Sequence, residues 1–337
     1  MKITIDEIAK IAGVSTTTIS RVLNNKPDVS PETREKILTI ISEYDFMPNA
    51  FAKAISLQKS HSIGLLIPHE ANYIFSNPFY VEVMRGVSTE IDRLGYFLFI
   101  CYPHEQNYLD IFKQKRVDGF ILLSPGSFHR GIIDSLISLE VPFVSTSKVP
   151  EEKSLIYVDV DNFLGATLVM EHLIGLGHQR IAFVGKPTLV SSVDRLNGYT
   201  ATLNKYQIPI DDSLIKIAEE ASIQGGSNVM NEFLKLENPP TAVLLVNDML
   251  AIGAIRAIQA RSGVVPDDMS IVGFDDVPLA ENIFPSLTTV RQPAFEKGRR
   301  AASMLVHYLE DKKKLKSQIL GIELIIRNST SKPRARK

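Results

Sequence analysis

The sequence lacks the features of a secreted or membrane protein. Its single cysteine, Cys101, cannot form a disulfide within one chain. No apolar run approaches the length of about 18 residues that a membrane-spanning helix needs, and the N-terminal segment has neither the charged nor the apolar region of a secretion signal. We therefore expect a cytoplasmic protein that does not insert into a membrane.

An excess of charge of one sign is also missing. The 337 residues include 37 Lys+Arg and 38 Asp+Glu, and the first 60 residues contain eight basic and seven acidic side chains. Net charge therefore gives no argument for nucleic-acid binding, which must rest on the placement of particular residues. With 45% hydrophobic residues, the chain can bury a sizeable core, and its length predicts roughly two domains.

Motifs that carry catalysis are absent as well. The sequence contains no GxxxxGK[ST] phosphate loop, no HExxH and no GxSxG, and its seven histidines show no i,i+4 pair typical of a metal site. Cys101 lies in an apolar run, which favours a buried core thiol over a nucleophile. We therefore expect a protein that is not an enzyme and that needs no cofactor and no metal.

What the sequence does contain is a change of pattern near residue 60. The first 60 residues show helical patterns only, whereas short β-type runs alternate with amphipathic helical stretches from Ile63 onward. Such alternation predicts an α/β region of doubly wound parallel sheets, and its size favours two subdomains with a cleft between them. The expected strands are Ile63–Ile67, Tyr96–Cys101, Gly119–Leu123, Phe143–Ser145, Ile181–Val184, Ala242–Val246 and Ser270–Gly273, and the expected helices include Tyr80–Leu94, Leu164–Leu176, Arg195–Tyr206, Val229–Leu236 and Met249–Ala260.

The N-terminal helical patterns predict a helix-turn-helix unit. Thr4 and Glu7 have the spacing of a capping box at the start of a first helix. Gly13 can adopt the left-handed conformation of a tight turn, and Ser15 then caps a second helix. Helix, short glycine turn and helix form the supersecondary unit that many proteins use to read DNA.

The second helix has a polar outer face. Ile19, Val22 and Leu23 provide its inward stripe. In a major groove, an arginine can bind two acceptors on guanine and a threonine can contact a thymine methyl group. An ordinary helical pair with a solvated face remains an equal alternative from these residues alone. The outward side chains are Thr16, Thr17, Ser20 and Arg21.

Two further segments follow the helix pair. A third helix is expected from the cap Ser30 and from apolar residues at helical spacing that end at Tyr44. Next, Asn49 can cap a helix of about two turns, which is too short to be stable alone in water. Pairing of two copies on DNA could stabilise it, with Ile55 as a wedge between base pairs, although a plain linker helix is an equal alternative.

The ordered motifs of the chain resemble those of the lactose-repressor/galactose-repressor family of bacterial transcription regulators. They include ITIDEIAKIAGVSTTTISRVLNN, MPNAFAKAI, SNPFYVEVMRGV, RVDGFILLS, GHQRIAFVG, NDMLAIGAIRAI and VPDDMSIVGFDD. The resemblance implies a helix-turn-helix headpiece at 1–47, a hinge helix and linker at 48–60, and a two-lobed periplasmic-binding-protein-like effector and dimerisation domain at 61–327. The basic residues Lys332, Arg334, Arg336 and Lys337 separately predict a solvated basic tail at 328–337. The resemblance also implies a homodimer on palindromic operator DNA, controlled by a small molecule in the cleft.

The resemblance also assigns site residues. The DNA-binding residues that it implies are Thr16, Thr17 and Arg21 for base reading, Ser15, Ser20 and Asn24 for phosphate contacts, and Asn49, Ala52 and Ile55 for the minor groove. The effector-binding residues that it implies are Phe79, Tyr80, Asp161, Arg195, Asn247 and Asp275.

The chemistry of these cleft residues favours a sugar effector, because carboxylates, amides and arginine match hydroxyls while aromatic rings cover apolar faces. Ala221 stands where the family usually has a stacking aromatic residue, and the loop from His69 to Phe75 is longer than usual. This longer loop, together with Ser147-Lys148 and the motif VDRLNGY, resembles the maltose-operon repressors of the family, which makes maltose or a maltodextrin the specific candidate. The expected function is regulation, as a repressor, of carbohydrate-utilisation genes. The alternatives are a purine or other non-sugar effector, or a periplasmic-type solute-binding protein.

Overall fold

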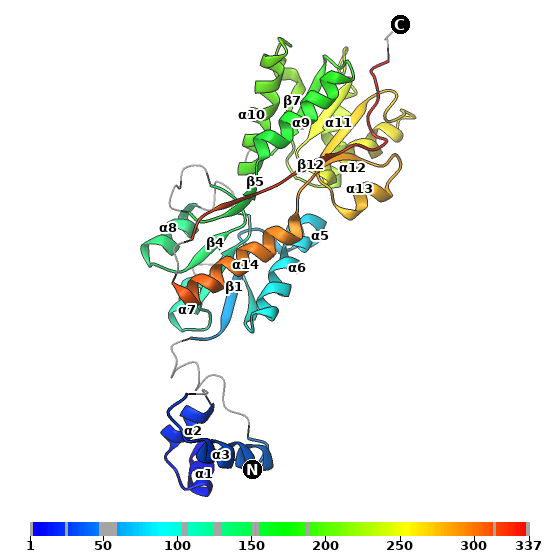
Figure 1. Ribbon diagram of the computed structural model, residues 1–337. Coiled ribbons are helices and arrows are strands. Elements are labelled where there is room, and N and C mark those ends of the chain that lie inside the picture. Colours follow the sequence, from blue (N-terminus) through cyan, green and yellow to red (C-terminus); the bar gives the residue numbers. More distant parts are fainter. Residues whose placement is uncertain are drawn as a thin grey trace. The chain divides into compact units, whose positions relative to one another are not determined.

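The chain divides into two units, residues 1–60 and 61–337. In this computed structural model, the described residues are 3–23, 26–46, 59–102, 107–124, 130–149, 152, 155–186, 189–312 and 315–334 (Figure 1). Among them, no helix has both the length and the apolar character that crossing a bilayer requires.

The described part of the first unit contains three helices around a small apolar core. The predicted capping box is present, because the Thr4 amide donates to Glu7 Oε2 across 2.8 Å and the Glu7 amide donates to Thr4 Oγ1 across 3.3 Å. Gly13 ends the first helix with φ 70°, as expected for the tight turn. The buried residues include Ile8, Ile19 and Ile37, one from each helix. The helices are α1 (Ile5–Ala12), α2 (Thr16–Leu23) and α3 (Pro31–Glu43).

The first lobe of the second unit is a four-stranded parallel sheet in the order β2-β1-β3-β4. Its strands are β1 (Ser62–Leu66), β2 (Phe97–Cys101), β3 (Gly119–Leu122) and β4 (Phe143–Ser145), and its helices are α5 (Ala71–Ser76), α6 (Pro78–Arg93), α7 (Asn107–Lys113), α8 (Arg130–Ser138) and α14 (Ala294–Asp311). Helices α6 and α14 lie side by side although they are far apart in the sequence (Figure 1). Their backbones approach so closely that a Cβ on Gly86 would collide with the Phe295 carbonyl group.

The second lobe is a six-stranded sheet in the order β12-β10-β9-β8-β6-β7, in which only β12 runs antiparallel to its neighbour. Its strands are β6 (Ile181–Gly185), β7 (Ile215–Ile217), β8 (Ala242–Leu245), β9 (Ser270–Asp275), β10 (Thr288–Arg291) and β12 (Glu323–Ile325). Its helices are α9 (Asn162–Gly175), α10 (Val190–Lys205), α11 (Ile223–Phe233), α12 (Asp248–Gln259) and α13 (Pro278–Asn282). The predicted two-lobed α/β architecture is confirmed.

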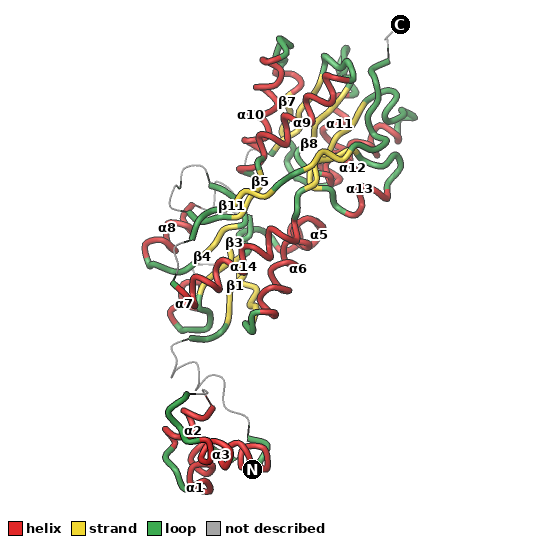
Figure 2. Tube along the Cα trace, viewed as in Figure 1, coloured by secondary structure: helices red, strands yellow, loops and turns green. Residues whose placement is uncertain are grey.

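The chain passes between the two lobes three times. The first passage follows β5 (Val158–Val160) into α9, the second joins β10 to α14, and the third follows β11 (Gln318–Leu320) to β12. Strands β5 and β11 pair in parallel and form a separate two-stranded sheet (Figure 2). Each lobe is therefore built from segments that are not contiguous in the sequence.

The segment predicted as a solvated basic tail begins with residues that are held on the second lobe, although Lys332 and Arg334 are exposed. Ser329 is fully buried, its hydroxyl accepts the Thr288 amide, and its carbonyl oxygen accepts the Ile271 amide. Arg334 forms ion pairs with Asp267 and Asp268. Backbone and side-chain hydrogen bonds hold this segment on the second lobe, which composition alone did not reveal.

Candidate functional site

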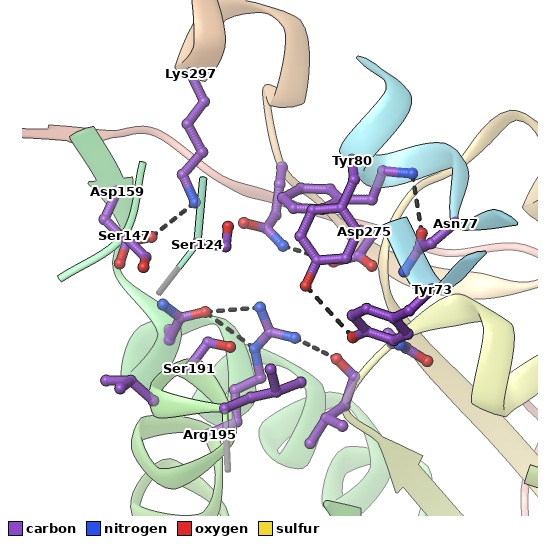
Figure 3. Close-up of a pocket in the computed structure, with 17 residues that line it drawn as sticks. Tyr73, Asn77, Tyr80, Ser124, Ser147, Asp159, Ser191, Arg195, Asp275 and Lys297 are labelled. Carbon is purple, nitrogen blue, oxygen red and sulfur yellow. Dashed lines mark hydrogen bonds and ion pairs between the residues drawn. The ribbon is translucent and has the colours of Figure 1, made fainter. Parts of the chain in front are cut away.

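A pocket lies between the two lobes and draws side chains from both (Figure 3). The first lobe supplies residues from α5, α6 and α14, and the second lobe supplies residues from the ends of its central strands and from the starts of its helices. Polar groups thus converge at the carboxyl edges of parallel strands, where open α/β sheets bind ligands. Five of the six predicted effector residues line it: Phe79, Tyr80, Arg195, Asn247 and Asp275.

The sixth predicted residue, Asp161, is not part of the pocket lining. It is exposed and caps α9, because its Oδ1 accepts the Leu164 amide across 2.8 Å. The neighbouring residues Asp159 and Asn162 line the pocket instead. The strand ends immediately before Asp161, so the start of α9 uses this carboxylate for capping.

Arg195 is the buried cation of the second lobe. Its guanidinium group donates from Nε and Nη2 to Asn162 Oδ1, at 3.0 and 2.8 Å, and from Nη1 to the Val246 carbonyl oxygen. It also lies over the Phe274 ring, 3.5 Å from the ring centre. Burial lowers the pKa of this guanidinium, although Asp275 opposes the shift. The group is thereby held rigidly at the edge of the pocket.

Asp275 ends β9 and reaches the pocket from a left-handed backbone conformation, with φ 125°. Its Oδ1 accepts a hydrogen bond from Gln292 Nε2 across 2.6 Å. Burial raises the pKa of its carboxyl group to about 7, against the opposing effects of Arg195 and Lys297. Asp275 can therefore serve as a proton donor or as an acceptor near neutral pH.

The first lobe contributes a buried ion pair. Lys297 Nζ lies 2.8 Å from Asp159 Oδ1, and both side chains are almost completely buried. The Asp159 carboxylate also accepts the backbone amides of Val160, at 2.8 Å, and Lys148, at 2.9 Å. Sequence reasoning missed this pair, because the two residues lie far apart in the chain and belong to no motif.

An aromatic wall closes one side of the pocket. The Tyr73 and Tyr80 hydroxyl oxygens lie 3.4 Å apart, and their ring centres are 5.6 Å apart (Figure 3). Burial raises the pKa of both phenols, so they remain neutral donors. Tyr73 was not predicted as a site residue. The signal was the longer loop after His69, which forms α5 and carries this tyrosine.

The remaining cleft expectations concern Asn247 and Ala221. Asn247 lines the pocket, but it also caps α12 by accepting the Leu250 amide across 2.8 Å. Its Nδ2 donates to the Ala221 carbonyl oxygen across 3.3 Å. Ala221 itself is buried and does not line the pocket. The amide of Asn247 is therefore already oriented by the fold.

The outer face of α2 carries the described DNA-binding candidates. Thr16, Thr17 and Arg21 are exposed, and Ser20 is partly exposed. Ser15 caps the helix, since its Oγ accepts the Thr18 amide across 3.2 Å. The other predicted DNA contacts lie outside the described residues: Asn24, Asn49, Ala52 and Ile55.

Comparison with known proteins decides what this combination of headpiece and cleft is. Residues 4–49 match the family model described as bacterial regulatory proteins of the lacI family, and residues 170–330 match that of a periplasmic binding protein-like domain. The HTH-type transcriptional regulator DegA of Bacillus subtilis (strain 168) is 36% identical over 343 residues, covering 98% of this chain and 99% of DegA. This chain belongs to the LacI family.

Solved structures similar to this chain agree with its assignment to the LacI family. A lac repressor dimer bound to operator and the anti-inducer ONPF is 27% identical, with a TM-score of 0.85 and coverage of 98% of this chain and 100% of that chain. The CelR-cellobiose complex is 29% identical, with a TM-score of 0.74 and coverage of 97% and 99%. The protein is thus a DNA-binding transcriptional regulator and not an enzyme.

Proposed function

We propose that this LacI-family regulator represses carbohydrate-utilisation genes in the cytoplasm, as a homodimer on palindromic operator DNA, and that a sugar in the cleft controls operator binding. The assignment of a sugar as the effector is supported by one observation: Arg195, Asn247 and Asp275 converge in the pocket with aromatic side chains of the first lobe. Fixed donors and acceptors around one ligand match several hydroxyls, and aromatic rings cover the apolar face of a pyranose.

The similar proteins support this proposal. The CelR structure contains cellobiose, and the lac repressor structure is a dimer bound to operator. Two recognition helices related by a twofold axis match two half-sites of a palindrome. We therefore assign Thr16, Thr17 and Arg21 to base edges, and Ser15, Ser20 and Asn24 to phosphates.

The coupling between cleft and operator is proposed to run through the hinge. Because the chain passes between the lobes three times, a ligand that contacts both lobes changes how far they close. We propose that residues 48–60 convey this change, with Asn49, Ala52 and Ile55 in the minor groove. Hydrogen exchange should show this segment protected on operator and unprotected in the free protein.

The experiment that tests the function combines two measurements. A gel-shift assay should show retardation of a palindromic duplex and weaker retardation of a duplex with one half-site scrambled. Calorimetry against a panel of sugars that includes maltose and maltodextrins, and against a panel of purines, identifies the effector class. Binding of a purine without binding of any sugar would contradict the sugar assignment, and a monomer bound to one half-site in sedimentation would contradict the dimer.

A further inference from the structure

The first-lobe wall of the pocket contains an ammonium group with spare hydrogen-bonding capacity. Lys297 has three N–H donors, and its hydrogen-bonding partner among the described residues is Asp159 Oδ1. Two backbone amides also hold the Asp159 carboxylate, so this acid is anchored independently of the lysine. The ion pair therefore positions Lys297 at the pocket and leaves donors for a ligand.

Ser147 immediately precedes Lys148, whose amide donates to Asp159 Oδ2 across 2.9 Å, and it lines the same pocket as the ion pair (Figure 3). Its side chain is buried and lines the pocket, and its Oγ has no hydrogen-bond partner within the part of the chain that the structure describes. A buried hydroxyl without a partner is costly, so its presence indicates a group that a ligand satisfies. Lys297 and Ser147, which we call the ammonium corner, thus offer two donors to the same pocket.

The positive charges of the pocket are not fully balanced by ionised acids. Its buried cations are Arg195 and Lys297, and the hydrogen-bond acceptors of Arg195 among the described residues are neutral oxygens. Lys297 is paired with Asp159, whereas burial raises the pKa of Asp275 to about 7, so this acid is largely protonated below neutrality. One buried positive charge is then only partly compensated, and such a charge is costly away from water.

We propose that the effector is a sugar acid, such as a uronate or an aldonate, and that its carboxylate binds at the ammonium corner formed by Lys297 and Ser147. This inference rests on the proposed function and deepens it by naming the effector class. A carboxylate is a monoanion that accepts charge-assisted hydrogen bonds from both donors. A phosphate carries about −1.5 to −2 charges at pH 7, and the nearby Asp159 carboxylate would repel it more strongly.

Matched pairs of ligands test the proposal. Glucuronate and galacturonate differ from glucose and galactose only at C6, where a carboxylate replaces a hydroxymethyl group. Calorimetry on the full-length protein should give at least one uronate that binds about 10-fold or more tightly than its parent hexose, since a hydrogen bond to a charged group is the stronger kind. A hexose or maltose that binds as tightly as every sugar acid would overturn the inference and leave the sugar effector standing. Purine binding alone would overturn both.

Variants of the ammonium corner complete the test. Lys297→Met should abolish the preference for the sugar acid, and the double variant Asp159→Asn/Lys297→Met should do the same without leaving a buried acid unpaired. Ser147→Ala removes a hydroxyl that forms no hydrogen bond with any described residue, and it should lower the affinity for the sugar acid about 10-fold. The control Lys205→Met removes a lysine that pairs with Glu171 on the surface and should change nothing. An unchanged preference in both Lys297→Met and Ser147→Ala would overturn the proposal.

Discussion

Arg21 is positioned to exchange one partner for another. Its guanidinium lies 3.3 Å from Asp28, and both side chains are about half exposed. An exposed ion pair of this kind contributes only about 0–1 kcal/mol, so leaving Asp28 for a base edge costs little. The structure thus allows the exposed arginine to be both paired in the free protein and available to DNA.

Arg21→Ala should weaken specific operator binding by about 1–3 kcal/mol and reduce the preference at one base pair, because a bidentate contact to guanine is lost. Fluorescence anisotropy with operators substituted one position at a time measures both effects. Asp28→Ala is the control, since it removes the same ion pair and leaves the arginine free, and it should not weaken binding. Equal weakening on every sequence would identify Arg21 as a phosphate contact.

Asp275 should make stability depend on pH in a defined direction. Its pKa in the folded protein is about 7, above the ordinary value of 3.8, so the folded state holds the proton more tightly than the unfolded state does. The free energy of unfolding should therefore fall as pH rises from about 4 through 7, because ionisation then favours the unfolded chain.

Asp275→Asn removes this titration and tests the prediction. We expect the melting temperature of the variant minus that of the unsubstituted protein to increase from pH 5 to pH 8. Thermal unfolding in matched buffers measures this difference. The variant should still retard operator but should lose the response to effector. A melting-temperature difference that is constant over this range would show that Asp275 does not titrate there, and full release of operator by effector would remove Asp275 from the site.

At the scale of elements, the turn between α1 and α2 depends on a single glycine. Gly13 has φ 70°, and no heavy atom lies near the position of an added Cβ. Gly13→Ala should therefore act through backbone strain alone and destabilise the headpiece by about 1 kcal/mol. The melting temperature of the headpiece, measured by thermal unfolding, and the affinity for operator should both fall. Gly131→Ala is the matched control, because this helical glycine also has open space but no positive φ, and the headpiece should not respond to it.

Elements and site residues differ in how well the sequence predicts them. Buried runs such as Gly119–Leu123 identify the central strands, because burial on both faces requires continuous apolar residues. Strands β5 and β11 have three residues each and lie outside the main sheets, so no such run marks them.

The motifs identify most of the predicted pocket residues but do not distinguish between neighbouring polar residues at the start of α9. Asp161 was assigned to the cleft, yet it caps α9, and the pair of Asp159 and Lys297 depends on a tertiary contact between distant segments. Tyr73 entered the pocket through an insertion that the sequence marked only as a longer loop. The local sequence pattern therefore predicted the architecture. The contacts within the pocket depend instead on how the three chain segments that join the lobes bring them together.

At the scale of the whole molecule, control of DNA by the cleft must be reciprocal. If effector changes operator affinity by a coupling free energy of about 1–3 kcal/mol, operator must change effector affinity by the same factor. Titration of effector into the free protein and into the operator complex gives two dissociation constants for effector. Titration of operator into the free protein and into the effector complex gives two dissociation constants for operator. The ratio within each pair should be the same. A scrambled duplex at equal concentration is the control. Unequal ratios would mean that more than one ligand or state is involved.

The late position of α14 has a consequence for how the protein is made. This helix covers the first lobe, but the ribosome synthesises it only after nearly all of the second lobe. The nascent chain must hold β1, β3 and α6 without their covering helix while more than half of the protein is still to be translated, and exposed apolar surface of this kind is prone to aggregation. The first lobe cannot be completed before α14 is made, and the second lobe cannot be completed before β12 is made. A message truncated before α14 would therefore yield two unfinished lobes rather than one finished lobe.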